Sequence, residues 1–194
     1  MSKADITRHY ILEKAFQLIY EHGYQATSVD KILETTDVTK GAFYYHFKNK
    51  EDMGLAMIKE IIWPRFKASL IDPHTNFSDP VEGIYETIKS FMMGISEDQL
   101  RNGCPTNNMI QEMAPLNDRF KQALADILNS WKEEIQNILT KAMESGRLGK
   151  HDYESVASFI VAGYEGTRGI GKLYHSYAYY DSYLKQLKRY LGTL

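Results

Sequence analysis

The sequence predicts an all-α fold of about nine helices, and three kinds of observation support it. Apolar residues recur three or four positions apart over most of the chain, which is the spacing of one face of an α-helix. Serine, threonine, aspartate and asparagine stand where these stripes begin, and glycine stands where several of them end, as at helix caps. Prolines and short polar clusters separate the stripes.

Composition describes an ordinary globular protein. Hydrophobic residues make up 43% and charged residues 25% of the 194 residues, and the net charge of -2 excludes a broadly basic nucleic-acid coat. A single cysteine, Cys104, allows no intramolecular disulfide. Neither a signal peptide nor a membrane-spanning run is expected, so a cytoplasmic protein without a membrane partner is predicted.

Four helices are expected in the first part of the chain, at residues 5–22, 28–34, 39–47 and 50–70. Asp5 or Thr7 opens the first helix, and Gly23 follows its end. Pro64 lies within the fourth helix and should kink or divide it near Trp63. Five further helices are expected at residues 79–95, 106–113, 117–145, 152–173 and 182–191. Residues 97–103 are expected to form a loop.

The second and third helices are short, and three or four residues join them, as in a helix-turn-helix motif. The third helix turns Ala42, Phe43 and Phe47 inward, and its outer face carries a lysine, a glycine and two tyrosines. Such a face suits the major groove of DNA, where basic side chains reach base edges or phosphates and hydroxyls bond phosphates. The same periodicity also suits a helical hairpin of an ordinary bundle, whose tyrosines cover the core.

The run Gly-Ala-Phe-Tyr-Tyr-His-Phe-Lys-Asn-Lys-Glu-Asp, preceded by Val-Thr-Lys, closely resembles the signature of TetR-family transcriptional regulators. The resemblance covers about Ile11 to Gly54. The sequence departs from the family at Thr36-Asp37, where alanine-glycine is usual. We expect a left-handed residue in this turn, and aspartate tolerates that conformation better than most residues other than glycine.

The resemblance implies a helix-turn-helix DNA-binding domain at residues 1–50 and an effector-binding and dimerisation domain at residues 51–194. It places DNA contacts at family positions, to which we add the helix cap Thr39: Ser28, Thr39, Lys40, Gly41, Tyr44, Tyr45, His46 and Lys50. It also implies a homodimer in which the last two helices pair with their copies as a four-helix bundle. The glycines of the 152–173 helix either allow that close packing or make room for an intramolecular neighbour or a ligand.

A small-molecule inducer pocket is expected in the C-terminal domain, lined by Phe91, Met92, Cys104, Met109, Met113, Phe120, Trp131, Tyr164 and Arg168. Methionine and aromatic residues suit an ordinary core equally well. Arg168 either pairs with an acidic ligand or with a carboxylate such as Glu165. Cys104 belongs to a motif that resembles one found before a short helix near the ligand site of TetR-like regulators. It is either a reactive thiol near a helix N-terminus or a small buried packing residue.

Catalysis is not expected. The sequence has no nucleophile elbow, glycine-rich phosphate loop or His-Glu-x-x-His motif, and its histidines lack metal-ligand spacing, so no enzyme, cofactor or metal site is predicted. The prediction is a ligand-responsive DNA-binding regulator, a repressor that a small-molecule inducer releases from a palindromic operator. The alternative is a small-molecule-binding or enzymatic helical bundle that does not bind DNA.

Overall fold

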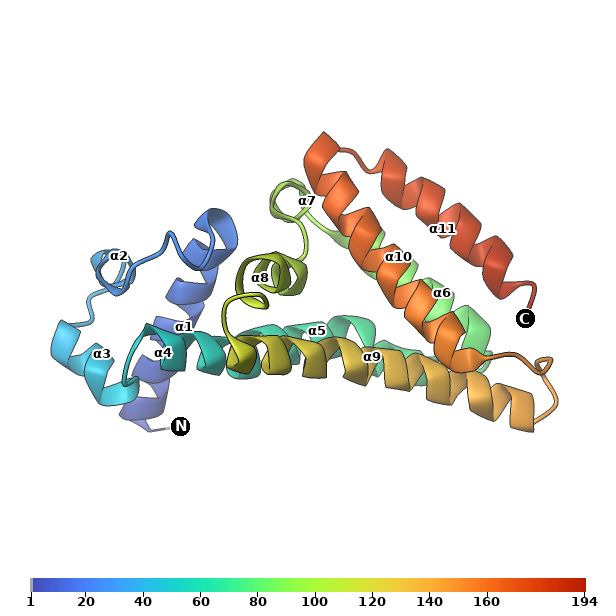
Figure 1. Cartoon of the computed structure of the whole chain (residues 1–194), viewed down its shortest axis with the longest axis horizontal. Coiled ribbons are helices and arrows are strands. Elements are labelled where there is room, and N and C mark those ends of the chain that lie inside the picture. Colours follow the sequence, from blue (N-terminus) through green and yellow to red (C-terminus); the bar gives the residue numbers. More distant parts are fainter. Residues whose placement is uncertain (1) are drawn as a thin grey trace. The chain divides into compact units, whose positions relative to one another are not determined.

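A computed structural model of the chain describes residues 2–194, without the side chains of residues 75 and 76, and all regular elements in that range are helical (Figure 1). The all-α prediction is therefore confirmed. The chain folds into two compact units. Unit 1 consists of Met1–Arg65 and Pro105–Ala125, and unit 2 of Phe66–Cys104 and Asp126–Leu194. The predicted boundary at residue 50 separates a DNA-binding from an effector-binding domain, whereas these units are defined by packing. The functional boundary therefore stays a prediction.

Unit 1 is built around its first helix, against which the next three helices pack. Its elements are α1 (Lys3–His22), α2 (Val29–Glu34), α3 (Lys40–His46), α4 (Lys50–Met57), the π-helical turn η1 (Ile58–Ile62), α8 (Pro105–Met113) and the start of α9 (Asp118–Glu144). The core is apolar and fully buried: Ile11, Leu12, Ala15, Ile32, Phe43, Phe47, Met53, Met57 and Phe120. These positions are the apolar stripes of the sequence, so hydrophobic burial explains the arrangement.

Side-chain caps fix where these helices begin. Ser28, Thr39 and Asn49 each accept a hydrogen bond from a backbone N–H in the first turn of the helix that follows, as predicted. The first helix starts earlier than predicted, because Ser2 is its cap and Asp5 completes a capping box three positions later. Asp5 therefore lies inside the first turn rather than at its start.

The turn between α2 and α3 does not use a left-handed residue, so that expectation is wrong. Among the described residues, His175 is the only one other than glycine with a positive φ. The hydroxyls of Thr35 and Thr36 donate to the carbonyls of Ile32 and Leu33 at the end of α2. Those bonds satisfy helix-end carbonyls without the backbone geometry that glycine would supply.

The connecting helix is divided just before Pro64, as predicted. It changes from α4 to the π-helical turn η1 and continues as α5 (Trp63–Leu70). Proline cannot donate a backbone hydrogen bond, and its ring crowds the carbonyl four residues earlier. The wider π-helical turn accommodates that loss while keeping the helix continuous.

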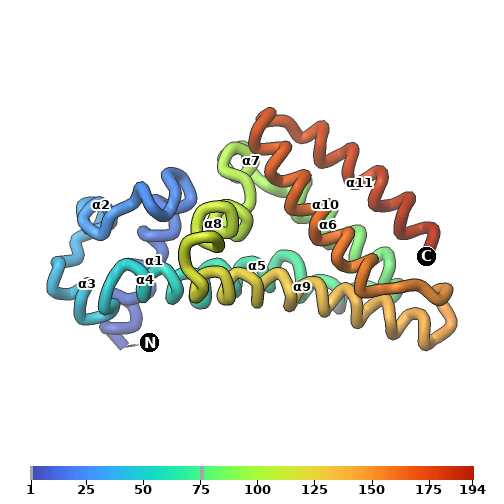
Figure 2. Tube along the Cα trace, viewed as in Figure 1, coloured from blue at the N-terminus to red at the C-terminus, as the bar shows by residue number. Residues whose placement is uncertain are grey.

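Unit 2 is a helical bundle in which α6, α10 and α11 pack together. Its elements are the end of α5, the 3₁₀ turn η2 (Asp72–Asn76), α6 (Pro80–Gly94), α7 (Glu97–Asn102), the rest of α9, α10 (Tyr153–Tyr174) and α11 (Ala178–Leu191). His175 has φ 48° and reverses the chain between α10 and α11, which lie side by side (Figure 2). No helix in the described part of the chain is long and apolar enough to span a membrane.

Two helices of unit 2 differ from the prediction. Residues 97–102 form α7 rather than a loop, because Ser96 and Gln99 make a capping box. The last helix begins at Ala178, four residues earlier than predicted, because the turn at His175 leaves the residues after it free to continue as helix.

Candidate nucleic-acid interface and ligand site

The helix α3 has one buried and one exposed face. Phe43 and Phe47 are 0% and 1% exposed, whereas Tyr44 and Tyr45 are 49% and 78% exposed. At Gly41, an added Cβ would meet nothing nearer than the Thr39 hydroxyl at 4.0 Å, so the start of the helix is open to close approach by another molecule. An open helix start can come close to the major groove, and exposed tyrosine hydroxyls can hydrogen-bond phosphate oxygens beside it.

Arg8 of α1 holds the far end of α3. Its guanidinium donates to the backbone carbonyl of His46 at 3.0 Å and lies over the ring of Phe47, 4.5 Å from its centroid. The same group pairs with Glu60 at 2.6 Å. A cation at a helix C-terminus also interacts favourably with the helix dipole. Arg8 therefore positions the recognition helix. The local sequence pattern did not predict this role of Arg8.

Lys40 begins α3 and is tied to α2. Its ammonium pairs with the Asp30 carboxylate at 2.8 Å, and this hydrogen bond and charge raise the pKa of Lys40. Both side chains are largely exposed, so the pair is a weak one in water. A phosphate can therefore replace Asp30 at little cost.

Lys50 has intramolecular partners in this structure. Its ammonium donates to the carbonyls of Tyr24 at 2.6 Å and Gln25 at 3.4 Å, and it lies 4.3 Å from the centroid of the Tyr24 ring. Burial lowers the pKa of Lys50, although the charge of Glu112 opposes that shift. Lys50 therefore braces the turn between α1 and α2, and its contact with DNA phosphate stays a prediction.

The remaining predicted DNA-binding residues come from the same short helices. The Ser28 hydroxyl caps α2 and the Thr39 hydroxyl caps α3, and both residues are exposed. His46 is half-buried in the last turn of α3. The predicted DNA-binding residues thus lie at the starts of α2 and α4 and along α3, which is the arrangement of a helix-turn-helix DNA-binding protein.

Comparison with known proteins places this helix-turn-helix protein in a family. Residues 11–57 match the family described as bacterial regulatory proteins, tetR family. Residues 80–187 match the tetracyclin repressor-like C-terminal domain. The chain belongs to the TetR family and is a DNA-binding transcriptional regulator, which confirms the expectation of a regulator rather than an enzyme.

Named relatives cover most of the chain. The transcriptional regulator AcuR of Cereibacter sphaeroides is 30% identical over 168 residues, covering 84% of this chain and 75% of AcuR. The transcriptional repressor DhaR of Mycobacterium sp. strain GP1 is 26% identical over 161 residues, which cover 82% of this chain and 79% of DhaR. The NemR repressor of Escherichia coli is 26% identical over 145 residues, which cover 73% of this chain and 69% of NemR.

Solved structures share the fold. The regulatory protein TetR from Rhodobacter sphaeroides superimposes with a TM-score of 0.81 at 29% identity, over 92% of this chain and 95% of that one. The reduced form of Escherichia coli NemR superimposes with a TM-score of 0.83 at 20% identity, over 94% of this chain and 96% of that one. The second likeness concerns the fold alone.

Six of the nine predicted ligand-binding residues lie in unit 2: Phe91, Met92, Cys104, Trp131, Tyr164 and Arg168. Aromatic contacts connect several of them. The Tyr164 ring lies 4.9 Å from that of Trp131 and 6.4 Å from that of Phe91, and the Arg168 guanidinium lies 5.5 Å from the Phe91 ring. The other three, Met109, Met113 and Phe120, belong to unit 1. Phe120 packs there against Tyr24, with ring centroids 4.9 Å apart.

Buried charged groups adjoin the aromatic residues. The Cys104 thiol donates to Glu165 at 3.4 Å, and Arg168 donates to the carbonyl of Gly103 at 2.6 Å. Burial raises the pKa of Glu165 to about 7, although the Cys104 hydrogen bond and the Arg168 charge oppose the shift. The sequence did not predict the hydrogen bond between Glu165 and Cys104. It also did not predict the burial of Tyr180, whose ring lies 5.9 Å from the Arg168 guanidinium.

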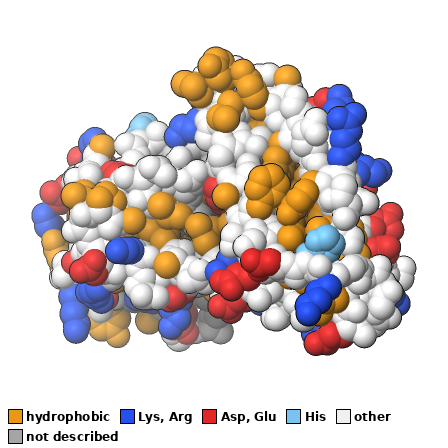
Figure 3. All heavy atoms as spheres, turned by 45° about the vertical axis from the view of Figure 1, so that its right-hand side comes forward, with side chains coloured by type: hydrophobic (Ala, Val, Ile, Leu, Met, Phe, Trp, Pro, Cys, Tyr) orange, Lys and Arg blue, Asp and Glu red, His pale blue; other side chains and the backbone are white. Residues whose placement is uncertain are grey.

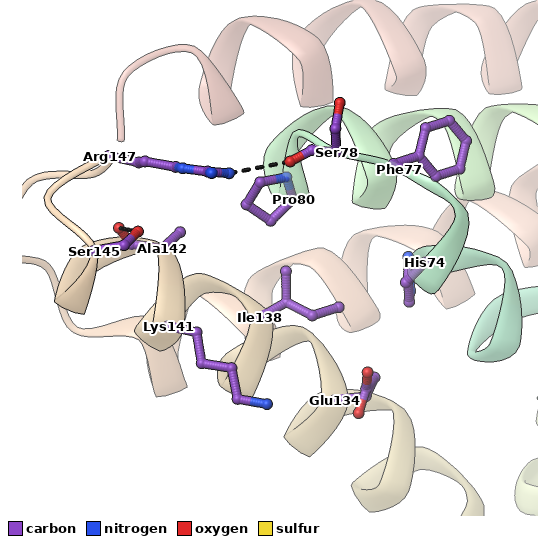
Figure 4. Close-up of a pocket in the computed structure, with 10 residues that line it drawn as sticks. All are labelled: His74, Phe77, Ser78, Pro80, Glu134, Ile138, Lys141, Ala142, Ser145 and Arg147. Atoms are coloured by element: carbon purple, nitrogen blue, oxygen red, sulfur yellow. Dashed lines mark hydrogen bonds between the residues drawn. The ribbon is translucent and has the colours of Figure 1, made fainter.

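A separate pocket of about 340 Å³ lies in unit 2 between η2, the start of α6 and the end of α9 (Figure 4). His74 and Glu134 lie toward one side of it, and Arg147 extends from the other side and donates to the carbonyl of Ser78 at 3.0 Å. None of the predicted ligand-binding residues lines this pocket. Within the described residues, no group of three metal-ligating side chains is present.

Proposed function

We propose that this regulator is a homodimer that binds a near-palindromic operator through α3 and leaves it when a small-molecule inducer binds. The observation that carries the proposal is the exposure of Tyr44 and Tyr45 on a helix whose other face is fixed by buried phenylalanines. The eight predicted DNA-binding residues act from this face and its two neighbouring helix starts. In a dimer, the two recognition helices enter successive major grooves about 34–36 Å apart.

An exposed apolar face on α10 supports the dimer. Phe159, Ile170 and Leu173 are 57%, 44% and 71% exposed, and their spacing places them on one side of the helix. Figure 3 shows hydrophobic side chains gathered at the top of the view, at the height of the turn between α10 and α11. A second copy of the same face would remove these side chains from water.

The sequence left two roles open for the glycines of α10: room for a neighbour in the same chain, or close approach of a partner helix. Added Cβ atoms at Gly163 and Gly171 would lie 2.7 Å from Tyr183 and 2.4 Å from Tyr180, so both glycines make room for α11 of the same chain. At Gly166 and Gly169 an added Cβ would meet nothing within 4 Å. Those two glycines lie on the exposed side and suit close approach of a partner helix.

The buried aromatic and charged residues around Tyr164 are the site we propose for the inducer. A ligand there releases DNA only if it binds more tightly to the conformation with low operator affinity. Repression is the sign we propose, because DhaR and NemR are named repressors. We also propose a cytoplasmic location, because a regulator of this kind acts on DNA.

Leu173→Glu tests the dimer, with Leu116→Glu as its matched control, because Leu116 of unit 1 is also an exposed leucine, at 61% against 71% for Leu173. Sedimentation should show the Leu173 variant as a monomer and the control as a dimer. The monomeric variant should lose most of its affinity for a selected duplex. The wild-type protein should lose similar affinity when one half of the duplex site is scrambled. A dimeric Leu173 variant, or indifference to the scrambled half-site, would contradict the proposal.

A further inference from the structure

The turn between α1 and α2 is held by a side chain that lies far away in the sequence. The Glu112 carboxylate near the end of α8 accepts one hydrogen bond from the backbone N–H of Tyr24 at 2.8 Å and another from that of Gln25 at 2.6 Å. Both oxygens of the carboxylate are used. Paired bonds to a charged acceptor fix orientation as well as distance.

The same two residues are held from their carbonyl side by Lys50 of α4. Its ammonium donates to the carbonyls of Tyr24 and Gln25, and the Tyr24 hydroxyl donates to the Lys50 carbonyl at 3.1 Å. Gly23 adjoins the carboxylate with φ 88°, and an added Cβ there would lie 3.3 Å from a Glu112 oxygen. The turn is therefore held by an anion from α8 and a cation from α4, and Gly23 leaves room for the anion.

Close packing extends the contact beyond these bonds. At Gly54 of α4, an added Cβ would lie 2.7 Å from both the Phe120 and the Tyr24 rings. Arg119 pairs with Glu51 at 2.8 Å. Residues 105–125 are thus packed against the helix-turn-helix segment as part of one unit.

The opposite end of α8 continues directly into the buried residues of unit 2. Pro105, the first residue of α8, follows Gly103 and Cys104. Arg168 of α10 holds the Gly103 carbonyl at 2.6 Å, and the Cys104 thiol bonds Glu165. One short helix therefore follows Gly103 and Cys104 directly in the sequence, and its last turn is bonded to the turn that leads to α2.

We infer that Glu112 is a positioning residue for the recognition helix. Because its paired bonds attach the turn before α2 to α8, a displacement of α8 moves this turn and, with it, α2 and α3. The inference rests on the proposed function, because it assigns the route by which an inducer alters operator affinity. Coupling of this kind is reciprocal, so operator binding must also alter the state of α8. Reciprocity allows a test that requires no inducer.

Hydrogen exchange with a selected operator duplex, measured on the full chain, tests the inference. The proteins compared are the wild type, Glu112→Ala and the control Gln111→Ala, whose exposed side chain on the same helix donates to Asn107 at 3.3 Å. In Glu112→Ala, the amides of Tyr24 and Gln25 should exchange at least about tenfold faster, as expected when a charged acceptor is lost. Duplex binding should change exchange in α8 of the wild type and the control, but not of Glu112→Ala.

The outcomes separate this inference from the function on which it rests. A wild type that binds no duplex would overturn the proposed function and the inference together. A wild type that binds duplex without any change in α8, or a Glu112→Ala protein whose α8 responds like the wild type, would overturn the inference alone. If Glu112→Ala does not fold, Glu112→Gln carries the same comparison, because it keeps the volume but loses the charge and one acceptor.

Discussion

In a Leu173→Glu protein, which we expect to be monomeric, alanine at Gly171 should destabilise the fold, whereas alanine at Gly169 of the same helix should stabilise it. At Gly171 the new Cβ would lie 2.4 and 2.9 Å from two ring atoms of Tyr180, a fully buried side chain with no room to withdraw. Overpacking of this kind costs about 1–3 kcal/mol, and such short contacts place it near 3. Replacing a helical glycine returns about 1 kcal/mol. The net loss at Gly171 is therefore about 2 kcal/mol.

At Gly169 only the helix propensity changes in the monomer, because nothing in the same chain lies within 4 Å of the new Cβ. The expected gain is about 1 kcal/mol, so the two variants should differ by about 3 kcal/mol. Urea unfolding of the monomeric proteins, followed by circular dichroism, measures this difference without a contribution from dimer association. Equal shifts of the two variants in the same direction would refute the packing of α10 against α11.

Three further outcomes are expected. If Lys50 also contacts a phosphate, Lys50→Ala should reduce the slope of log affinity for the operator against log salt concentration by about one. An unchanged slope would show that Lys50 only braces the turn between α1 and α2. The buried Cys104 thiol should react with a maleimide slowly in the folded protein and fully after unfolding, and Cys104→Ser should leave operator release by reactive electrophiles unchanged; a lost response would identify a sensor. Because burial raises the pKa of Glu165 to about 7 from 4.5, the folded protein holds a proton that the unfolded chain releases between these values. The free energy of unfolding should therefore fall as pH rises from 4.5 to about 7. In Glu165→Gln this part of the pH dependence should be absent, and a pH profile equal to that of the wild type would contradict the prediction.

The helix-turn-helix could be predicted because its signals are local. The caps Ser28, Thr39 and Asn49 act on backbone groups within three residues, and the inward spacing of Phe43 and Phe47 needs only the period of a helix. The sequence also contained the capping box of α7, but six residues without an apolar stripe gave no periodicity to support it.

The contacts that hold the interface in place could not be predicted in the same way. Arg8 reaches a carbonyl 38 positions away, and Glu112 reaches amides 88 and 87 positions away. Nothing in the neighbouring residues distinguishes these side chains from ordinary charges on a helix surface. The glycines of α10 posed the same problem, because only the position of α11 separates Gly171 from Gly169.

The central claim is that α3 binds DNA through its exposed tyrosines, and selection of binding sequences from a random duplex pool tests it most directly. The wild type and a Tyr44→Ala, Tyr45→Ala double variant would be selected in parallel at low and moderate salt. Because both tyrosines are exposed, their loss should leave the fold intact. The account predicts a near-palindromic sequence enriched by the wild type and lost by the variant. A folded wild type that enriches no sequence, or a variant that enriches the same sequence equally well, would contradict it.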